Sequence, residues 1–85
     1  MITALIVDDE KKNHESLLGL LKEYCPTVEV IGQSSSVEEA LQFISKKKPQ
    51  LVFLDVEMPN GTGFDLLRKV PKIDFKIIFV TAHAL

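Results

Sequence analysis

The sequence predicts an α/β domain built on a parallel sheet. Short apolar, β-branched runs alternate along the chain with longer segments in which apolar residues recur at helical spacing. The predicted order is strand, helix, strand, helix, strand, helix, strand, which is typical of a parallel sheet with helices on both faces. With 85 residues, 46% of them hydrophobic and 26% charged, residues 1–85 form one small domain.

The first half of the chain supplies two strands and two helices. Residues 3–7 form a β-branched and aliphatic strand, and a helix spans residues 11–25 before a proline ends it. Residues 28–32 form the second strand. Ser36 and Glu39 match the S-x-x-E capping box, which opens a second helix. The predicted buried face of the first helix consists of Leu17, Leu18, Leu21 and Tyr24.

The second half supplies two strands and one helix. Residues 51–54 are apolar on both faces, as in a central strand that helices cover above and below. A loop over residues 58–63, rich in Pro, Asn and Gly, precedes a helix that ends at Pro71. Residues 76–81 form the last strand. Three aromatic side chains are predicted to be core residues: Phe53, Phe64 and Phe79.

Composition excludes several classes of protein. The net charge of −2 is not that of a nucleic-acid-binding surface. No apolar run approaches the roughly 20 residues of a transmembrane helix, and the first residues do not resemble a secretory signal. The one cysteine, Cys25, excludes an internal disulfide and a zinc site of several cysteines, so we expect a reducing, cytoplasmic setting without membrane contact. Cys25 is interpreted as a small apolar filler and His14 as a surface histidine.

Acidic and hydroxyl side chains follow three of the predicted strands. Asp8 and Asp9 follow the first strand, Asp55 follows the third, and Thr81 lies at the end of the fourth. The carboxyl ends of parallel strands meet at one edge of the sheet, where open α/β sheets carry their sites. Two carboxylates about 4 Å apart repel each other by roughly 4 kcal/mol at an effective dielectric of 20, and Mg²⁺ prefers such oxygen ligands. An aspartate beside a metal and a hydroxyl is suited to accept a phosphoryl group.

Each of these residues also has an ordinary structural role when it is considered alone. Asp8 and Asp9 can cap the following helix, and Asp55 can be a cap or a loop residue. Thr81 can be a simple strand former. Their joint position at neighbouring strand ends favours the phosphoryl site.

Three segments, in order along the whole chain, resemble the receiver domain of two-component response regulators. They are Leu-Ile-Val-Asp-Asp-Glu at 5–10, Phe-Leu-Asp-Val-Glu-Met-Pro at 53–59 with Gly63 behind it, and Phe-Val-Thr-Ala at 79–82. The ending over residues 79–83 is similar to the LytR/AlgR-type subgroup, whose members carry a separate DNA-binding domain. The resemblance implies a flavodoxin-like three-layer sandwich whose parallel strands are ordered 2-1-3-4.

The resemblance also implies roles for the acidic residues. Asp55 is expected to be the phosphoacceptor, receiving its phosphoryl group from a histidine of a sensor kinase. Asp9 is expected to bind Mg²⁺ directly and Asp8 through water. The backbone carbonyl of Glu57, with Asp55 itself, completes the expected metal ligands.

Two further roles follow from the same resemblance. The Thr81 hydroxyl is expected to hydrogen-bond a phosphoryl oxygen and to mark the switch, and the Ala82 amide is expected to contact another oxygen. The domain is then a signalling domain rather than an enzyme, with only self-catalysed phosphoryl transfer and hydrolysis.

The chain departs from the family pattern at its end. A complete receiver is expected to continue with a helix, a strand and a helix, and to carry a lysine that neither Lys72 nor Lys76 matches. We therefore interpret the chain as a receiver truncated after its fourth strand, with DNA contact only through an absent output domain. Residues 77–80 become an apolar edge strand, which predicts a homo-oligomer formed through that strand or by exchange of elements.

Two other functions remain open at this point. A non-catalytic interaction module with a receiver-like fold is favoured by the missing lysine, and indifference to Mg²⁺ would support it. A phosphatase of the haloacid dehalogenase kind also places an aspartate after a strand, with a second acid two residues on. Glu57 stands there instead of the usual aspartate, and Asp8 and Asp9 would then be unexplained.

Overall fold

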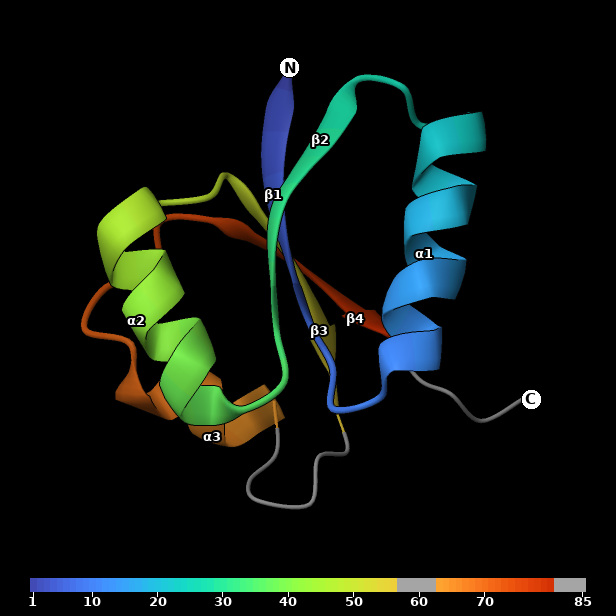
Figure 1. Ribbon diagram of the computed structural model, residues 1–85. Helices are drawn as coiled ribbons and strands as arrows, with labels where there is room; N and C mark the ends of the chain where they lie inside the picture. The colour runs from blue at the N-terminus through green and yellow to red at the C-terminus, as the bar shows by residue number, and fades with distance from the viewer. Residues whose placement is uncertain (57–62, 81–85) are drawn as a thin grey trace.

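The computed structural model describes residues 1–56 and 63–80 (Figure 1). Within these residues the elements alternate in the predicted order. They are β1 (Ile2–Val7), α1 (Lys11–Tyr24), β2 (Val28–Ser34), α2 (Val37–Lys47), β3 (Leu51–Asp55), α3 (Gly63–Lys69) and β4 (Lys76–Val80). None of the helices in the described part of the chain is long and apolar enough to cross a membrane.

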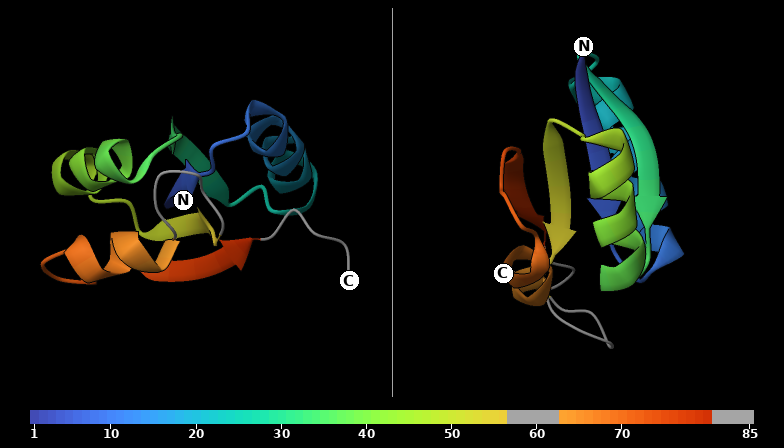
Figure 2. Two further views of the ribbon diagram at one scale, coloured as in Figure 1. Left: turned by 90° about the horizontal axis from the view of Figure 1, so that it is seen from below. Right: turned by 90° about the vertical axis from the view of Figure 1, so that its left-hand side faces the viewer.

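The four strands form one parallel sheet in the order β2-β1-β3-β4, which confirms the predicted order. Helices α2 and α3 lie on one face of the sheet and α1 lies on the other, as the left view of Figure 2 shows. The predicted three-layer α/β sandwich is therefore confirmed. Strands β1 and β3 are the central strands, so both of their faces are covered.

The core is divided between the two faces of these central strands. On the α2 and α3 face, Leu5, Val7, Val52 and Leu54 pack with Leu66 of α3 and with buried side chains of α2. On the α1 face, the buried residues are Ala4, Ile6, Leu21, Leu51 and Phe53. Every residue of β3 is buried, which confirms that an apolar run without alternation is a central strand.

The predicted capping box opens α2, with one addition. The Glu39 amide donates to the Ser36 hydroxyl oxygen at 3.2 Å, as expected of the cap. The Glu39 carboxylate accepts a hydrogen bond from the Ser35 hydroxyl at 2.7 Å. That hydrogen bond, helped by the Ser35 backbone amide, lowers the pKa of Glu39.

Strand β2 extends beyond its predicted end at Gly32 to Ser34. The register against β1 shifts there, since Ala4 pairs with Val30 whereas Leu5 pairs with Gly32. A Cβ atom at Gly32 would lie 2.2 Å from a ring carbon of Phe43 in α2. The glycine therefore allows α2 to approach the sheet closely and does not end the strand.

The predicted core positions of three aromatic residues and of the cysteine, all near the ends of elements, are wrong. Tyr24 is 70% exposed and belongs to neither core cluster. Cys25 is exposed, and its backbone N–H donates to the Leu21 carbonyl at 2.8 Å, so it ends α1 instead of filling the core. Phe64 and Phe79 are about half exposed and pack on each other with ring centroids 5.3 Å apart. They are half exposed because β4 is the edge strand of the described sheet.

Candidate functional site

Three carboxylates meet at the carboxyl end of the central strands. Asp8 directly follows β1 and Asp55 ends β3, and these strands are neighbours with Val7 paired to Leu54. One ligand oxygen from each of Asp8, Asp9 and Asp55 lies within 4.8 Å of the other two. Asp8 and Asp55 are buried whereas Asp9 is exposed. The structure thus brings together the three acidic residues that the sequence predicts to share one site.

The side chain of Asp8 is held by the first turn of α1. Its Oδ1 atom accepts hydrogen bonds from the Glu10 amide at 2.9 Å and from Asn13 Nδ2 at 3.3 Å. The Asp8 amide donates to the Ser34 carbonyl at 3.0 Å. Asp8 therefore contacts the start of α1 but does not cap it, since the N-cap residue is Glu10 and has no side-chain cap hydrogen bond. This contact occupies Oδ1 and leaves Oδ2 without a donor among the described residues.

His14 is a residue of this region that the sequence interpretation placed wrongly. It is buried, with Nε2 2.6 Å from the Asp8 carbonyl oxygen and Nδ1 2.9 Å from Oε1 of Gln33. The polar sequence neighbours suggested a surface position. The helical spacing contained the opposite signal, since position 14 lies two turns before Leu21 on the buried face of α1.

Helix α3 begins directly against the end of β3. The Gly63 amide donates to the Val56 carbonyl at 3.2 Å. A Cβ atom at Gly63 would lie 2.8 Å from the backbone oxygen of Asp55 and 2.9 Å from Cγ of Leu54. The absence of a side chain at Gly63 therefore lets α3 support the backbone that carries Asp55.

A cleft of about 280 Å³ opens beside the exposed side of the acidic cluster. Asp8, Asp9 and Lys11 line it on one side, and Ser35 and Glu39 line it on the other. The cleft offers an approach to the carboxylates between the start of α1 and the start of α2.

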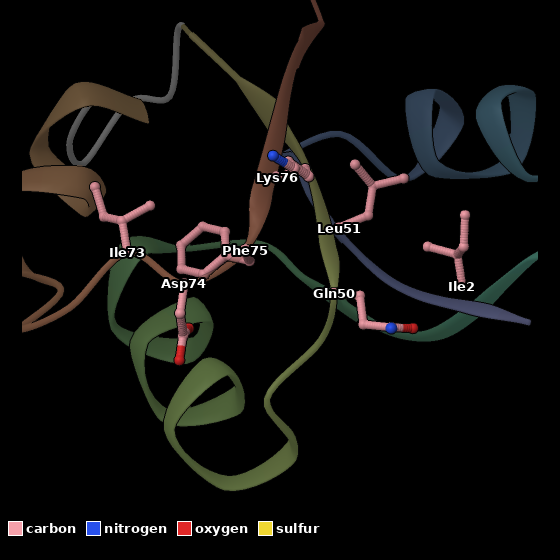
Figure 3. A pocket seen from close by; sticks show the side chains of 7 residues that line it. All are labelled: Ile2, Gln50, Leu51, Ile73, Asp74, Phe75 and Lys76. Atoms are coloured by element: carbon pink, nitrogen blue, oxygen red, sulfur yellow. The ribbon is translucent and has the colours of Figure 1, made fainter.

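A second hollow lies at the opposite end of the sheet. It has a volume of about 640 Å³ and is lined by the first residues of three strands, Ile2, Leu51 and Lys76, together with Gln50 and residues 73–75 (Figure 3). Because Asp8 and Asp55 lie at the carboxyl ends of β1 and β3, this hollow is separate from the acidic site.

The remaining predicted site residues lie outside the described residues. These are Glu57, Thr81 and Ala82, so their roles stay predictions.

The donor set fits a small, hard dication. All three clustered groups are carboxylates, and their oxygens are the ligands that Mg²⁺ prefers, usually with several waters retained. Three negative charges at this spacing repel one another, and a bound cation removes that repulsion. The site is therefore suited to hold Mg²⁺ beside the phosphoacceptor candidate.

The family model described as the response regulator receiver domain matches residues 4–85. With this fold and this acidic cluster, the chain belongs to the receiver domain family of response regulators, the proteins of two-component signalling. The predicted resemblance is confirmed, and the family does not favour the phosphatase or the non-catalytic module.

Two curated relatives show which response regulators the chain is similar to. An uncharacterized response regulatory protein of Shewanella oneidensis is 51% identical over 83 residues, covering 96% of this chain and 35% of that protein. The sensory transduction protein LytT of Bacillus anthracis is 38% identical over 85 residues, covering 98% of this chain and 34% of that protein. The chain thus spans about a third of the length of these relatives.

Solved structures share the fold. The response regulator MaeR bound to beryllium trifluoride aligns with a TM-score of 0.86 at 26% identity, covering 100% of this chain and 70% of that one. The response regulator domain of Thermotoga maritima CheB aligns with a TM-score of 0.84 at 28% identity, covering 96% of this chain and 61% of that one.

Proposed function

We propose that Asp55 accepts a phosphoryl group from a histidine of a sensor kinase in a Mg²⁺-dependent reaction that switches a downstream output. The observation that carries this proposal is the meeting of three carboxylates, one oxygen of each within 4.8 Å, at the carboxyl end of β1 and β3. Asp8, Asp9, Asp55 and the backbone carbonyl of Glu57 would hold the cation. The domain then acts as a self-phosphorylating signalling domain and not as an enzyme with a separate substrate.

The transfer itself needs little from the protein beyond position and charge. A carboxylate oxygen of Asp55 attacks phosphorus, a new O–P bond forms, and the N–P bond to the donor histidine breaks. Bound Mg²⁺ would offset the charge on the phosphoryl oxygens. Asp8 and Asp9 would hold the cation beside Asp55. Thr81 and Ala82 are proposed to donate hydrogen bonds to the remaining phosphoryl oxygens.

One solved neighbour supports this reading of the site. MaeR, with the same fold, is described as bound to beryllium trifluoride. This compound resembles a phosphoryl group in charge and shape. That a protein of this fold binds such a compound supports the proposal that the fold accepts a phosphoryl group.

Exposure to a small phosphodonor such as acetyl phosphate, with Mg²⁺, tests the acceptor. We expect intact-mass spectrometry to show one added phosphoryl group on the parent chain and none on Asp55→Asn, because an amide cannot form the acyl phosphate. Asp74→Asn is the matched control, since Asp74 is an exposed aspartate before β4, at the end of the sheet opposite Asp55. An adduct that persists in Asp55→Asn would contradict the assignment. Turnover of a generic phosphate ester would instead indicate the phosphatase.

The names of the relatives suggest the wider role. The relative in Klebsiella pneumoniae, 40% identical over 83 residues, is called the transcriptional regulatory protein CitB. We propose that the receiver controls transcription in the cytoplasm, with DNA contacted by a separate domain. The described part of this chain has no basic surface run except residues 46–48 at the end of α2, where cations are favoured by the helix dipole.

We further propose that the 85-residue chain self-associates through β4. Ile78 and Phe79 of this edge strand are 46% and 47% exposed, and exposed apolar edges pair with other chains. We expect sedimentation equilibrium to show dimers or larger species that Ile78→Lys converts to monomer. Ile73→Lys is the control, because Ile73 is equally exposed but lies outside the strand. A stable monomer of the parent at high concentration would refute this proposal.

A further inference from the structure

His14 joins three parts of the molecule at a buried position beside the acidic cluster. Only 5% of it is exposed. Its Nε2 atom lies 2.6 Å from the Asp8 carbonyl oxygen, and its Nδ1 atom lies 2.9 Å from the Gln33 side chain on β2. Because a carbonyl oxygen only accepts, Nε2 carries a hydrogen and donates it to Asp8. The Gln33 amide has both an acceptor and a donor end, so it can bond Nδ1 whether or not that atom carries a hydrogen.

The hydrogen bond to the Asp8 carbonyl acts on the backbone that carries Asp9. The peptide group between Asp8 and Asp9 is planar, so fixing its oxygen also fixes the orientation of its nitrogen and of the Asp9 Cα atom. Within residues 1–56 and 63–80, the Asp9 carboxylate has no hydrogen bond of its own. The position of this exposed carboxylate in the cluster therefore depends on its backbone.

The position of the Asp8 side chain depends less on His14 than the position of Asp9 does, because other hydrogen bonds also hold Asp8. Its Oδ1 atom is already held by the Glu10 amide and by Asn13, and its own amide is bonded to β2. Among residues 1–56 and 63–80, His14 supplies the only hydrogen bond that reaches the carbonyl oxygen of Asp8. The Gln33 bond then ties this contact to a sheet strand and not only to the helix.

We infer that His14 is a positioning residue for the metal ligands, which it orients by donating a hydrogen bond to the Asp8 carbonyl. This inference rests on the proposed function, because it concerns the same Mg²⁺ site. Groups that orient metal ligands without touching the metal are typically worth about 10-fold or more in metal affinity. To orient the ligands, the side chain at position 14 must therefore place a hydrogen-bond donor where Nε2 lies, within reach of the Asp8 carbonyl oxygen.

Two substitutions distinguish the hydrogen bond to Asp8 from the hydrogen bond to Gln33. The amide nitrogen of Gln reaches about as far as Nε2, so His14→Gln keeps the bond to Asp8. The amide of Asn reaches only as far as Nδ1, so His14→Asn keeps a partner for Gln33 but loses Asp8. Leu21→Ala is the control for lost stability, because Leu21 is buried on the same face of α1 away from the acidic cluster.

Titration calorimetry with Mg²⁺ alone, at fixed pH and ionic strength, measures the effect, and thermal unfolding is recorded separately. We expect His14→Asn to weaken Mg²⁺ binding about 10-fold and His14→Gln by less than about 3-fold. Leu21→Ala should lower the melting temperature and leave the affinity unchanged. Equal affinities for the Gln and Asn variants would overturn the inference while the parent still binds Mg²⁺. A parent that does not bind Mg²⁺ would overturn the proposed metal site, and this inference with it.

Discussion

Mg²⁺ is expected to reverse the order of stability of the parent and Asp9→Asn. Without the cation, the substitution should stabilise the fold by about 1 kcal/mol, the repulsion between two charges about 4 Å apart in water, because Asp9 is exposed. At Mg²⁺ concentrations about 100-fold above its dissociation constant, the parent should gain about 2.7 kcal/mol. For a domain of this size, that gain corresponds to on the order of 10 °C in the melting temperature. Asp9→Asn has lost a ligand and should gain much less.

Differential scanning calorimetry with and without Mg²⁺ measures this reversal. Glu23→Gln removes one negative charge from the exposed end of α1 and is the matched control, which should follow the parent in both conditions. If Mg²⁺ stabilises Asp9→Asn as strongly as the parent, Asp9 is not a ligand. If Mg²⁺ stabilises neither protein, the acidic cluster does not bind the cation.

Gly63→Ala is expected to destabilise the fold and to weaken the site together. The added methyl group would lie 2.8 Å from the Asp55 backbone oxygen and 2.9 Å from Leu54, so α3 or the end of β3 must shift. Overpacking of this kind costs about 1–3 kcal/mol. Because the shift displaces the backbone of Asp55, we expect a lower midpoint in urea unfolding and a lower yield of the phosphoryl adduct.

Gly19→Ala is the matched control, because it makes the same chemical change at an open position. Gly19 lies in the exposed middle of α1 and a Cβ atom there would meet nothing within 4 Å. This substitution should stabilise the chain by about 0.5–1 kcal/mol through helix propensity and leave the adduct yield unchanged. A Gly63→Ala protein as stable and as reactive as the parent would show that α3 does not support Asp55 as described.

The fold could be predicted from the sequence wherever a short sequence pattern is compatible with only one secondary structure and one burial pattern. The apolar run at 51–54 has no polar alternation, and only a strand covered on both faces buries all of it. The capping box at Ser36 fixed the start of α2 because its hydrogen bonds are local. Tertiary contacts decided the rest. Gly32 lies inside β2, where its missing side chain leaves space for the ring of Phe43, and no local sequence pattern contains that information.

The acidic site was predictable because strand ends in a parallel sheet share one edge. That rule placed Asp8, Asp9 and Asp55 together, as the structure shows. The hydrogen-bond partners of these residues did not follow from the same rule. The polar neighbours of His14 in sequence predict a surface position, whereas its place two helical turns before Leu21 puts it on the buried face of α1. The roles of Glu57 and Ala82 rest on the family resemblance alone, whereas Thr81 was also placed by the strand-end rule and lies outside the described residues.

The pairing of β1 with β3 gives the acidic site a mechanical role as well as a chemical one. Asp8 follows β1 and Asp55 ends β3, and these two central strands are separated along the chain by α1, β2 and α2. If the cluster holds a dication as proposed, binding would act as a reversible crosslink between two distant parts of the chain. Separating the two strands would then also require the release of the ion, so ion binding would couple to the stability of the sheet.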